Sequence, residues 1–223
     1  MDKQSLLDNY EKVLKRIDEI DKEKKVKLLL ATKTQNTEDI NFLIERGVKY
    51  IGENRVNELL DKYDSYNKNA ELHFIGTLQK NKVKYICDKV SLIHSVDSYD
   101  LAKEINKQSL KIGKIMNILV EINIGREESK SGIMPDDTEN FVKSLKDFQN
   151  IKVVGLMTMA PRCENKNDYY KYFGETKKIF DSLFSDNPEA ILSMGMSESY
   201  EYAIECGSNM VRLGSAVFGE RNR

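Results

Sequence analysis

The order of apolar and polar positions predicts strands and helices in alternation. Eight short apolar runs are typical of buried strands: 28–31, 48–51, 72–75, 91–95, 115–124, 151–157, 190–193 and 210–213. Segments with apolar residues at helical spacing lie between them, at 37–47, 56–60, 81–87, 98–105, 141–148, 169–184 and 200–205. A further short helix is expected after Gly214. This alternation is typical of a parallel sheet flanked by helices.

The number of units favours an α/β fold with a single closed (β/α)₈ TIM-type barrel. Residues 3–20 have apolar positions at helical spacing and precede the first strand, so we expect one extra N-terminal helix. We expect residues 1–223 to form one domain. The alternative is an open, doubly wound sheet, but the G-x-G-x-x-G turn of its dinucleotide-binding form is missing.

Composition and charge exclude several classes of partner. The chain has 223 residues, 35 basic and 36 acidic, and its net charge of −1 attracts neither nucleic acid nor an anionic membrane. Its apolar runs are too short to span a bilayer, and its first residues have no signal-peptide core. Three widely spaced cysteines, Cys87, Cys163 and Cys206, indicate a reducing cytoplasm. With only His73 and His94 beside them, no metal-ligand spacing is present.

Lys33 is the first candidate for chemistry, because it lies just beyond the first predicted strand. If side chains alternate between faces, Leu29, Ala31 and Lys33 point to the same side, into a core or its mouth. An ammonium there is costly unless it is paired or neutralised. A neutral amine can attack an aldehyde and form a Schiff base. The alternative is a strand-terminal lysine that simply reaches water.

The loops after the last two strands are candidates for binding an anion. The sequence SMGMSES follows the seventh strand, and RLGSAVFG spans the end of the eighth strand and the turn after it. Glycines allow a close approach of the backbone, and hydroxyl groups with helix N-terminal N–H groups bind anions well. In this type of barrel these loops often bind phosphate. Alternatively, Gly195 and Gly214 are ordinary turn residues, and Ser197 and Ser215 are ordinary helix caps.

Pyridoxal phosphate is an aldehyde with a phosphate arm, so it could bind both to Lys33 and to the anion-binding loops after the last two strands. Arg212 lies two residues before Gly214 and can face the pyridine nitrogen. A permanent cation there keeps the nitrogen unprotonated and weakens the cofactor as an electron sink. The alternative for Arg212 is a salt bridge across the mouth of the barrel.

The chain resembles the pyridoxal phosphate homeostasis proteins, which are relatives of the barrel domain of alanine racemase. The resemblance runs from about residue 5 to residue 221 and rests on eight motifs in order: LLLATKTQ around Lys33, GENRVNEL at 52–59, HFIGTLQKNKVKYI at 73–86, IHSVDS at 93–98, VEINIGREESKSGI at 120–133, VVGLMTMAP at 153–161, LSMGMSESYEYAI at 192–204 and MVRLGSAVFGER at 210–221. Each motif is weak alone, but all eight in this order are highly specific.

The resemblance implies a role for six residues. Lys33 would hold pyridoxal 5'-phosphate as a Schiff base, and Arg212 would meet the pyridine nitrogen. The phosphate would be bound by Ser197, Gly214 and Ser215, and Asn54 would lie near the cofactor. Position 215 is more often threonine in this family, but serine keeps the hydroxyl group.

Two functions are compatible with this resemblance. One is a non-catalytic protein of intracellular pyridoxal phosphate homeostasis, which holds the cofactor and delivers it to apo-enzymes. The other is a pyridoxal phosphate-dependent amino-acid racemase, which needs a second acid–base group on the opposite face of the cofactor. In alanine racemase a separate domain of a partner subunit supplies that group, and this chain ends within a few residues of the barrel. We therefore expect a carrier without catalytic residues, and a cytoplasmic monomer.

Overall fold

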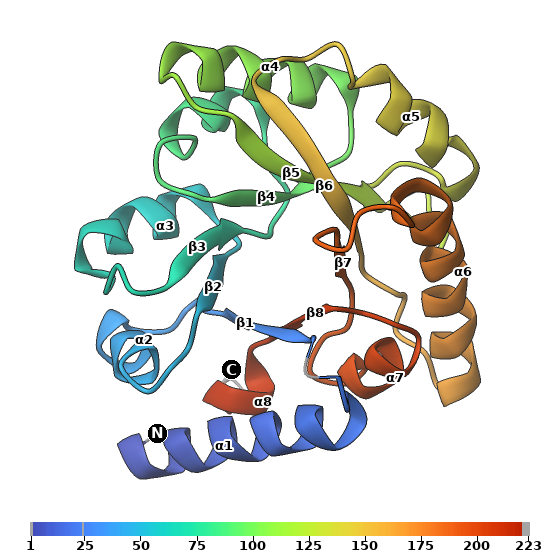
Figure 1. Ribbon diagram of the computed structural model, residues 1–223. Coiled ribbons are helices and arrows are strands. Elements are labelled where there is room, and N and C mark those ends of the chain that lie inside the picture. Colours follow the sequence, from blue (N-terminus) through green and yellow to red (C-terminus); the bar gives the residue numbers. More distant parts are fainter. Residues whose placement is uncertain (1, 24, 220–223) are drawn as a thin grey trace.

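Eight parallel strands form a closed barrel in the computed structural model of the protein, which describes residues 2–23 and 25–219 (Figure 1). The strands follow one another around the barrel in chain order, and β8 pairs with β1. They are β1 (Lys27–Ala31), β2 (Tyr50–Glu53), β3 (Glu71–Phe74), β4 (Leu92–Val96), β5 (Met116–Ile122), β6 (Ile151–Thr158), β7 (Ile191–Ser193) and β8 (Met210–Leu213). The prediction of a closed (β/α)₈ barrel is confirmed.

Helices connect the strands and cover the outside of the barrel. They are α1 (Lys3–Ile20), α2 (Thr37–Ile44), α3 (Val56–Lys62), α4 (Tyr99–Lys111), α5 (Thr138–Ser144), α6 (Lys166–Phe184), α7 (Tyr200–Glu205) and α8 (Ser215–Phe218). Three short 3₁₀ helices complete the connections: η1 (Tyr63–Ser65), η2 (Lys80–Tyr85) and η3 (Pro135–Asp137). Residues 220–223, the end of the predicted domain, lie outside the described part of the chain.

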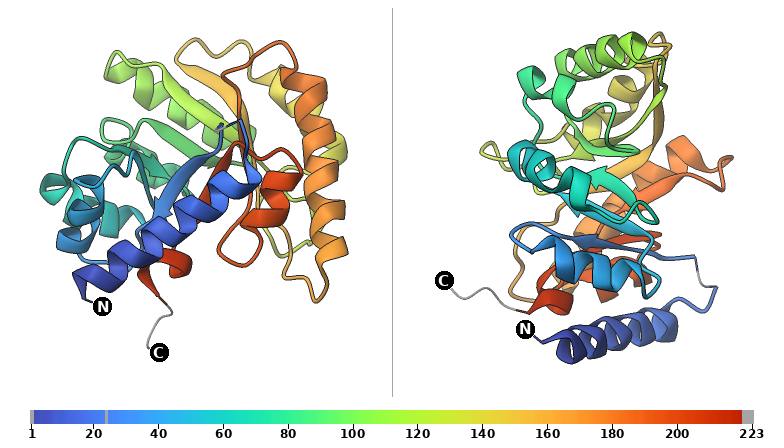
Figure 2. Two further views of the ribbon diagram at one scale, coloured as in Figure 1. Left: turned by 60° about the horizontal axis from the view of Figure 1, so that its bottom comes forward. Right: turned by 90° about the vertical axis from the view of Figure 1, so that its left-hand side faces the viewer.

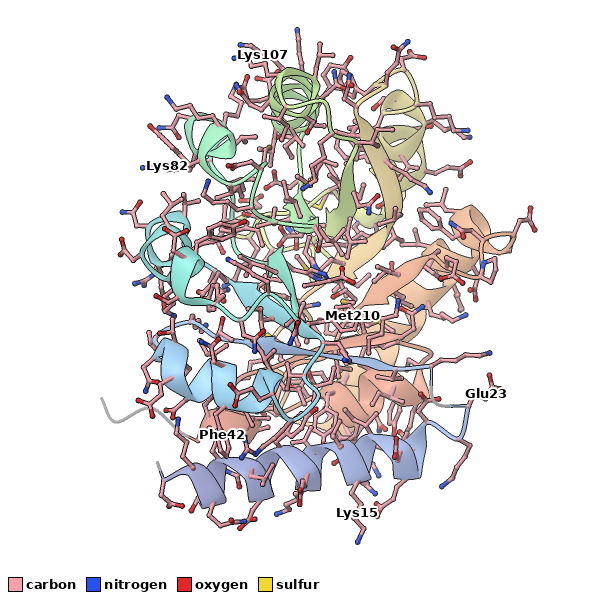
Figure 3. The ribbon with its side chains drawn as sticks, turned by 60° about the vertical axis from the view of Figure 1, so that its left-hand side comes forward. Lys15, Glu23, Phe42, Lys82, Lys107 and Met210 are labelled. Atoms are coloured by element: carbon pink, nitrogen blue, oxygen red, sulfur yellow. The ribbon has the colours of Figure 1, made fainter. Side chains whose placement is uncertain are left out.

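The predicted N-terminal helix is α1, which lies outside the barrel beside α8 (Figure 2). Its N-cap Asp2 accepts a hydrogen bond from the backbone N–H of Ser5, which satisfies one of the free donors of the first turn. One face of the helix is buried, through Leu6, Tyr10, Val13 and Ile17. Lys15 on the opposite face points into solvent (Figure 3). The period of the apolar positions therefore matches the face that packs.

The interior of the barrel is filled by two small apolar clusters. Leu29, Ile75 and Met210 form one, and Met210 lies near the centre of the molecule in Figure 3. Leu92, Leu119 and Met157 form the other. The much larger apolar cluster lies between the barrel and the surrounding helices. Buried polar side chains, considered below, occupy the rest of the interior.

The second strand is displaced by two residues from its predicted range, 48–51, to Tyr50–Glu53. Gly52 was expected to end this strand but lies within it, on the inner face. A Cβ atom at Gly52 would lie 2.6 Å from Leu29 Cδ2, so the glycine makes room for the core of the barrel. The predicted helix 81–87 is the 3₁₀ helix η2. No helix in residues 2–23 and 25–219 is long and apolar enough to cross a membrane.

Two glycines with different surroundings test how tightly the barrel wall is packed. Gly155 in β6 has φ +153°, and an added Cβ would lie 1.9 Å from the carbonyl oxygen of Ile191 in β7. Gly174 in α6 has no atom within 4 Å of an added Cβ. We expect Gly155→Ala to lower the free energy of unfolding by about 2–3 kcal/mol, and Gly174→Ala to raise it by about 0.5–1 kcal/mol. Urea unfolding of both variants measures this, and equal stability of the two would contradict the described β6–β7 contact.

Candidate cofactor site

A cavity of about 390 Å³ opens where β1 and β8 end. Five of the six residues predicted from sequence line it: Lys33, Ser197, Arg212, Gly214 and Ser215. The remaining lining comes from Ala31, Gln35, Ala160, Pro161, Arg162, Tyr169, Met196, Glu198, Ser199 and Gly219. The structure therefore brings together the first-strand lysine, the last-strand arginine and the two serine-containing turns.

Lys33 reaches this cavity through the alternation of side chains along β1. Leu29 packs inside the barrel against Ile75 and Met210, and Ala31 packs against the same cluster. Lys33 is the next residue on that side and lines the cavity with Ala31. The intervening Thr32 points the other way, toward the helices. The predicted common face of Leu29, Ala31 and Lys33 is confirmed.

A buried network fixes the backbone before Lys33. The Thr32 hydroxyl group donates to Glu53 Oε1 at 2.8 Å, and the same oxygen accepts from Lys62 Nζ at 3.0 Å and from the Tyr66 hydroxyl at 2.5 Å. Glu53 is fully buried, and the three donors to its Oε1 offset part of the cost of placing a carboxylate in the protein. Its Oε2 has no hydrogen-bond partner within the described residues. Lys62 Nζ also donates to the carbonyl oxygen of Thr32 at 3.0 Å.

The residue after Lys33 is fixed as well. Thr34 has φ +67°, a left-handed conformation that is uncommon for a residue other than glycine. Its backbone N–H donates to Glu58 Oε1, which also accepts from Lys62 Nζ at 2.5 Å. The sequence placed Glu53 beyond the end of a strand, and no motif revealed its contact with Lys62. This support of the Lys33 segment was missed because it depends on how α3 packs on β1 and β2.

The turns after β7 and β8 contact each other. The backbone N–H of Ala216 donates to Ser197 Oγ at 3.2 Å, which joins the start of α8 to the turn after β7. An added Cβ on Gly195 would lie 2.7 Å from the Cβ of Ala203, and one on Gly214 would lie 3.2 Å from the carbonyl oxygen of Ala31. Gly195, which also has φ +98°, is therefore required by a close contact, and a side chain at Gly214 would be tightly packed. Because α7 and α8 are short, an anion here would rely on turn N–H groups and hydroxyls.

Arg212 lies at the base of the cavity and is only 5% exposed. Its Nη1 donates to the carbonyl oxygen and to Oγ of Ser193, at 2.8 and 2.7 Å, and its Nη2 donates to the carbonyl oxygen of Thr158 at 2.9 Å. Burial lowers the pKa of Arg212 to about 10, while Glu121 acts in the opposite direction. Arg212 makes no salt bridge with any of the described residues. Among them, the alternative role considered for Arg212, a salt bridge across the mouth of the barrel, is therefore not observed.

Asn54 is the one predicted residue that does not line this cavity. It lines a neighbouring hollow with Arg55, Thr77, Gln79 and Lys82, among others. Its side-chain Oδ1 is buried and has no hydrogen-bond partner within the part of the chain that the structure describes. A role for Asn54 near a cofactor therefore stays a prediction.

The loop between β6 and α6 supplies a wall of the cavity that was not predicted. Ala160, Pro161 and Arg162 come from this loop, and Tyr169 comes from the first turn of α6. The motif at 153–161 marked the loop, but Tyr169 had been interpreted only as a helix position. Among residues 2–23 and 25–219, no three His, Cys, Asp or Glu side chains are grouped to hold a metal ion.

Comparison with known proteins places this geometry in a family. Residues 1–222 match the family described as "Alanine racemase, N-terminal domain". A protein of Aquifex aeolicus named pyridoxal phosphate homeostasis protein is 44% identical over 198 residues, which cover 87% of this chain and 87% of that protein. The chain belongs to the pyridoxal phosphate homeostasis protein family. The resemblance inferred from the eight motifs is thereby confirmed.

Solved structures of similar proteins have the same fold. A protein of Bifidobacterium adolescentis, described as an unknown protein, has a TM-score of 0.91 and 31% identity, and the match covers 97% of this chain and 95% of that one. PipY of Synechococcus elongatus, solved with PLP bound, has a TM-score of 0.80 and 25% identity, with 92% and 99% covered. The family fold is therefore shared along most of the chain.

A second hollow of about 650 Å³ adjoins the Lys33 cavity and shares Ala160, Pro161, Arg162 and Met196 with it. Glu121 on β5 lines this second hollow and is 3% exposed. Burial, with a smaller effect of the Asp97 carboxylate, raises the pKa of Glu121 to about 7, and Arg212 only partly offsets this. Glu121 is thus a buried carboxyl group that titrates near neutral pH.

The raised pKa of Glu121 makes the stability of the protein depend on pH. The folded protein favours the protonated form of the Glu121 carboxyl group. The contribution of this group to the free energy of unfolding is therefore fully present below the ordinary pKa of 4.5, and it is lost as the pH rises through about 7. Relative to the unsubstituted protein, Glu121→Gln should therefore gain stability across this range, by at most roughly 3 kcal/mol. Urea unfolding of both proteins at several pH values measures the difference. A difference that stays constant from pH 4.5 to pH 7 would contradict the described environment.

Proposed function

We propose that this protein binds pyridoxal phosphate in the Lys33 cavity and takes part in pyridoxal phosphate homeostasis. Lys33 Nζ would hold the aldehyde carbon as a Schiff base, with the aldehyde oxygen leaving as water. Arg212 would face the ring nitrogen, and Ser197, Gly214 and Ser215 would bind the phosphate. The observation that carries the proposal is that these five side chains and turns line one cavity. Support comes from the relatives named pyridoxal phosphate homeostasis protein and from PipY with PLP bound.

The residues present fit this cofactor in size and in chemistry. A volume of about 390 Å³ lies within the usual range for small-molecule sites, roughly 300–1,000 Å³. The cavity has a primary amine for the aldehyde and two hydroxyl-bearing turns for the phosphate. Gly214 lets the turn after β8 approach the carbonyl oxygen of Ala31 closely.

Arg212 limits the chemistry that the site supports. When bound, pyridoxal phosphate supplies an aldehyde that bonds to amines and a ring that withdraws electrons from them. The guanidinium group has only N–H donors, and three of its hydrogen bonds go to Ser193 and Thr158. Anchored in this way, Arg212 keeps its proton and cannot protonate the ring nitrogen. An unprotonated ring nitrogen makes the cofactor a weaker electron sink. The arrangement therefore suits a protein that holds the cofactor better than one that uses it for catalysis.

We propose a carrier rather than a racemase. Arg162 and Glu198 border the outer side of the cavity, and their side chains are 88% and 71% exposed. A site whose rim is open to water suits exchange of the cofactor better than committed proton transfer. Tyr169 is buried in the cavity wall, and its hydroxyl group accepts a hydrogen bond from the backbone N–H of Cys163 at 3.3 Å. The recipients we propose are apo-enzymes that use pyridoxal phosphate.

We propose further that residues 1–223 act as one domain in the cytoplasm. The free state of Cys87, Cys163 and Cys206 supports a reducing compartment. The expectation of a monomer stays a prediction.

The visible absorption spectrum tests the cofactor and its attachment point. After incubation with pyridoxal phosphate and removal of the excess, we expect the band of lysine-linked cofactor in the unsubstituted protein and in Lys15→Ala, whose lysine is exposed on α1. The band should be lost in Lys33→Ala, because no other predicted site residue carries a primary amine. A band that survives in Lys33→Ala with unchanged intensity would contradict the assignment of Lys33.

An assay of alanine racemisation separates the carrier from the racemase. We expect no turnover above that of Lys33→Ala with the loaded protein. Sustained racemisation that Lys33→Ala abolishes would overturn the carrier and establish an enzyme.

A further inference from the structure

The two histidines of the chain form a buried chain of hydrogen bonds that ends on Arg212. His73 Nδ1 lies 3.0 Å from His94 Nε2, and His94 Nδ1 lies 3.2 Å from Ser193 Oγ. Ser193 Oγ accepts from Arg212 Nη1 at 2.7 Å. Glu71 Oε2 lies 3.6 Å from His73 Nε2, an ion-pair distance and too long for a hydrogen bond. The sequence did not predict this chain, because the contact of His73 with His94 depends on how β3 and β4 pair.

The chain crosses the interior of the barrel from one end to the other. Glu71 is the first residue of β3 and lies at the rim where the strands begin. His73 and His94 follow further along β3 and β4. Ser193 ends β7, beside Arg212 at the base of the Lys33 cavity. The histidines and Ser193 are at most 1% exposed. The chain therefore links the cavity with the opposite, solvent-facing rim.

The arginine determines the direction of every proton in this chain. Arg212 can only donate, so Ser193 Oγ accepts from it and retains one proton, for which His94 Nδ1 is the neighbouring acceptor. His94 then carries its proton on Nε2 and donates it to His73 Nδ1. His73 in turn carries its proton on Nε2, which faces Glu71. In this order both rings are neutral Nε2–H tautomers.

The surroundings favour neutral rings. Burial lowers the pKa of His73 and lowers that of His94 further, and His73 and Arg212 add to the effect on His94. The charged groups that act on His73 are Glu71, which raises its pKa, and Lys27 on β1, which lowers it. The Tyr50 ring on β2 packs against His73, with ring centroids 5.6 Å apart. Glu121 on β5 acts on Arg212 at the other end of the chain.

We propose that His94 and His73 are positioning residues, which fix Arg212 in the cavity by ordering the Ser193 hydroxyl group. With His94 as acceptor, the Ser193 proton points away from Arg212, and the Oγ lone pairs stay directed at the guanidinium group. Without that acceptor the hydroxyl group is free to rotate, and its lone pairs are no longer held in one direction toward the guanidinium group. The effect of the chain on cofactor binding rests on the proposed function, whereas the proton order is a property of the protein alone.

Nitrogen-15 NMR of the imidazole rings in the protein without cofactor tests the proton order. Only two histidines are present, so a single His73→Gln variant assigns both sets of signals. We expect both rings to be neutral Nε2–H tautomers at pH 7, and Ser193→Ala to weaken the tautomer preference of both rings, because His73 takes its proton order from His94. A protonated ring or an Nδ1–H tautomer at either position in the unsubstituted protein would overturn the proposal.

A double-mutant cycle tests whether the chain acts on Arg212. We expect Ser193→Ala and His94→Phe each to weaken binding of pyridoxal phosphate about tenfold, and the double variant to be no weaker than either. The control is Ser95→Ala, next to His94 on β4, whose hydroxyl group is also buried but lies outside the chain. Additive effects, or an equal effect in the control, would contradict positioning through Ser193.

The NMR experiment and the binding measurements test different parts of the proposal. If His94→Phe does not fold, Ser193→Ala compared with Ser95→Ala still decides whether the ordered hydroxyl matters. Failure of the unsubstituted protein to bind pyridoxal phosphate would overturn the proposed function, and the NMR tautomers would then decide the proton order alone.

Discussion

Closure of the barrel between β1 and β8 is the constraint on which the candidate site depends. The two strands pair in parallel, with Leu29 beside Arg212 and Leu30 beside Leu213. The same register brings the end of β1 to the turn after β8, where Gly214 approaches the carbonyl oxygen of Ala31. Lys33, near the start of the chain, therefore faces a turn near its end. An open sheet would leave these two edges apart and would not form the cavity.

Two polar networks stabilise the two halves of this site from opposite sides of the barrel wall. Outside the wall, Glu53 and Lys62 fix the backbone around Lys33. Inside it, Ser193 and the histidines lie behind Arg212. Burying such groups is costly unless their hydrogen bonds are satisfied. Their partners come from strands and helices distant in sequence, so the site is preorganised by the fold as a whole.

The sequence alone predicted the barrel, the extra helix and five of the residues that line the Lys33 cavity. Lys33 was predicted because the alternation of side chains along a strand can be read from the local sequence. Gly214 and Ser215 were predicted because turns also have a local sequence pattern. The predicted range of β2 was wrong, because Gly52 lies inside the strand and makes room for Leu29 instead of forming a turn. This contact joins two strands, so the local sequence around Gly52 does not show it. The His73–His94 contact and the Glu53 network depend on the register between strands and on helix packing, which no local pattern encodes. The role of Asn54 near the cofactor was implied by family resemblance, and the structure places Asn54 in a neighbouring hollow.

A crystal structure of the protein soaked with pyridoxal phosphate tests the central claim most directly. The account predicts electron density continuous from Lys33 Nζ to the cofactor, with the ring nitrogen facing Arg212 and the phosphate bound by Ser197, Gly214 and Ser215. Cofactor bound elsewhere, or lying in this cavity with its phosphate directed away from those turns, would contradict it.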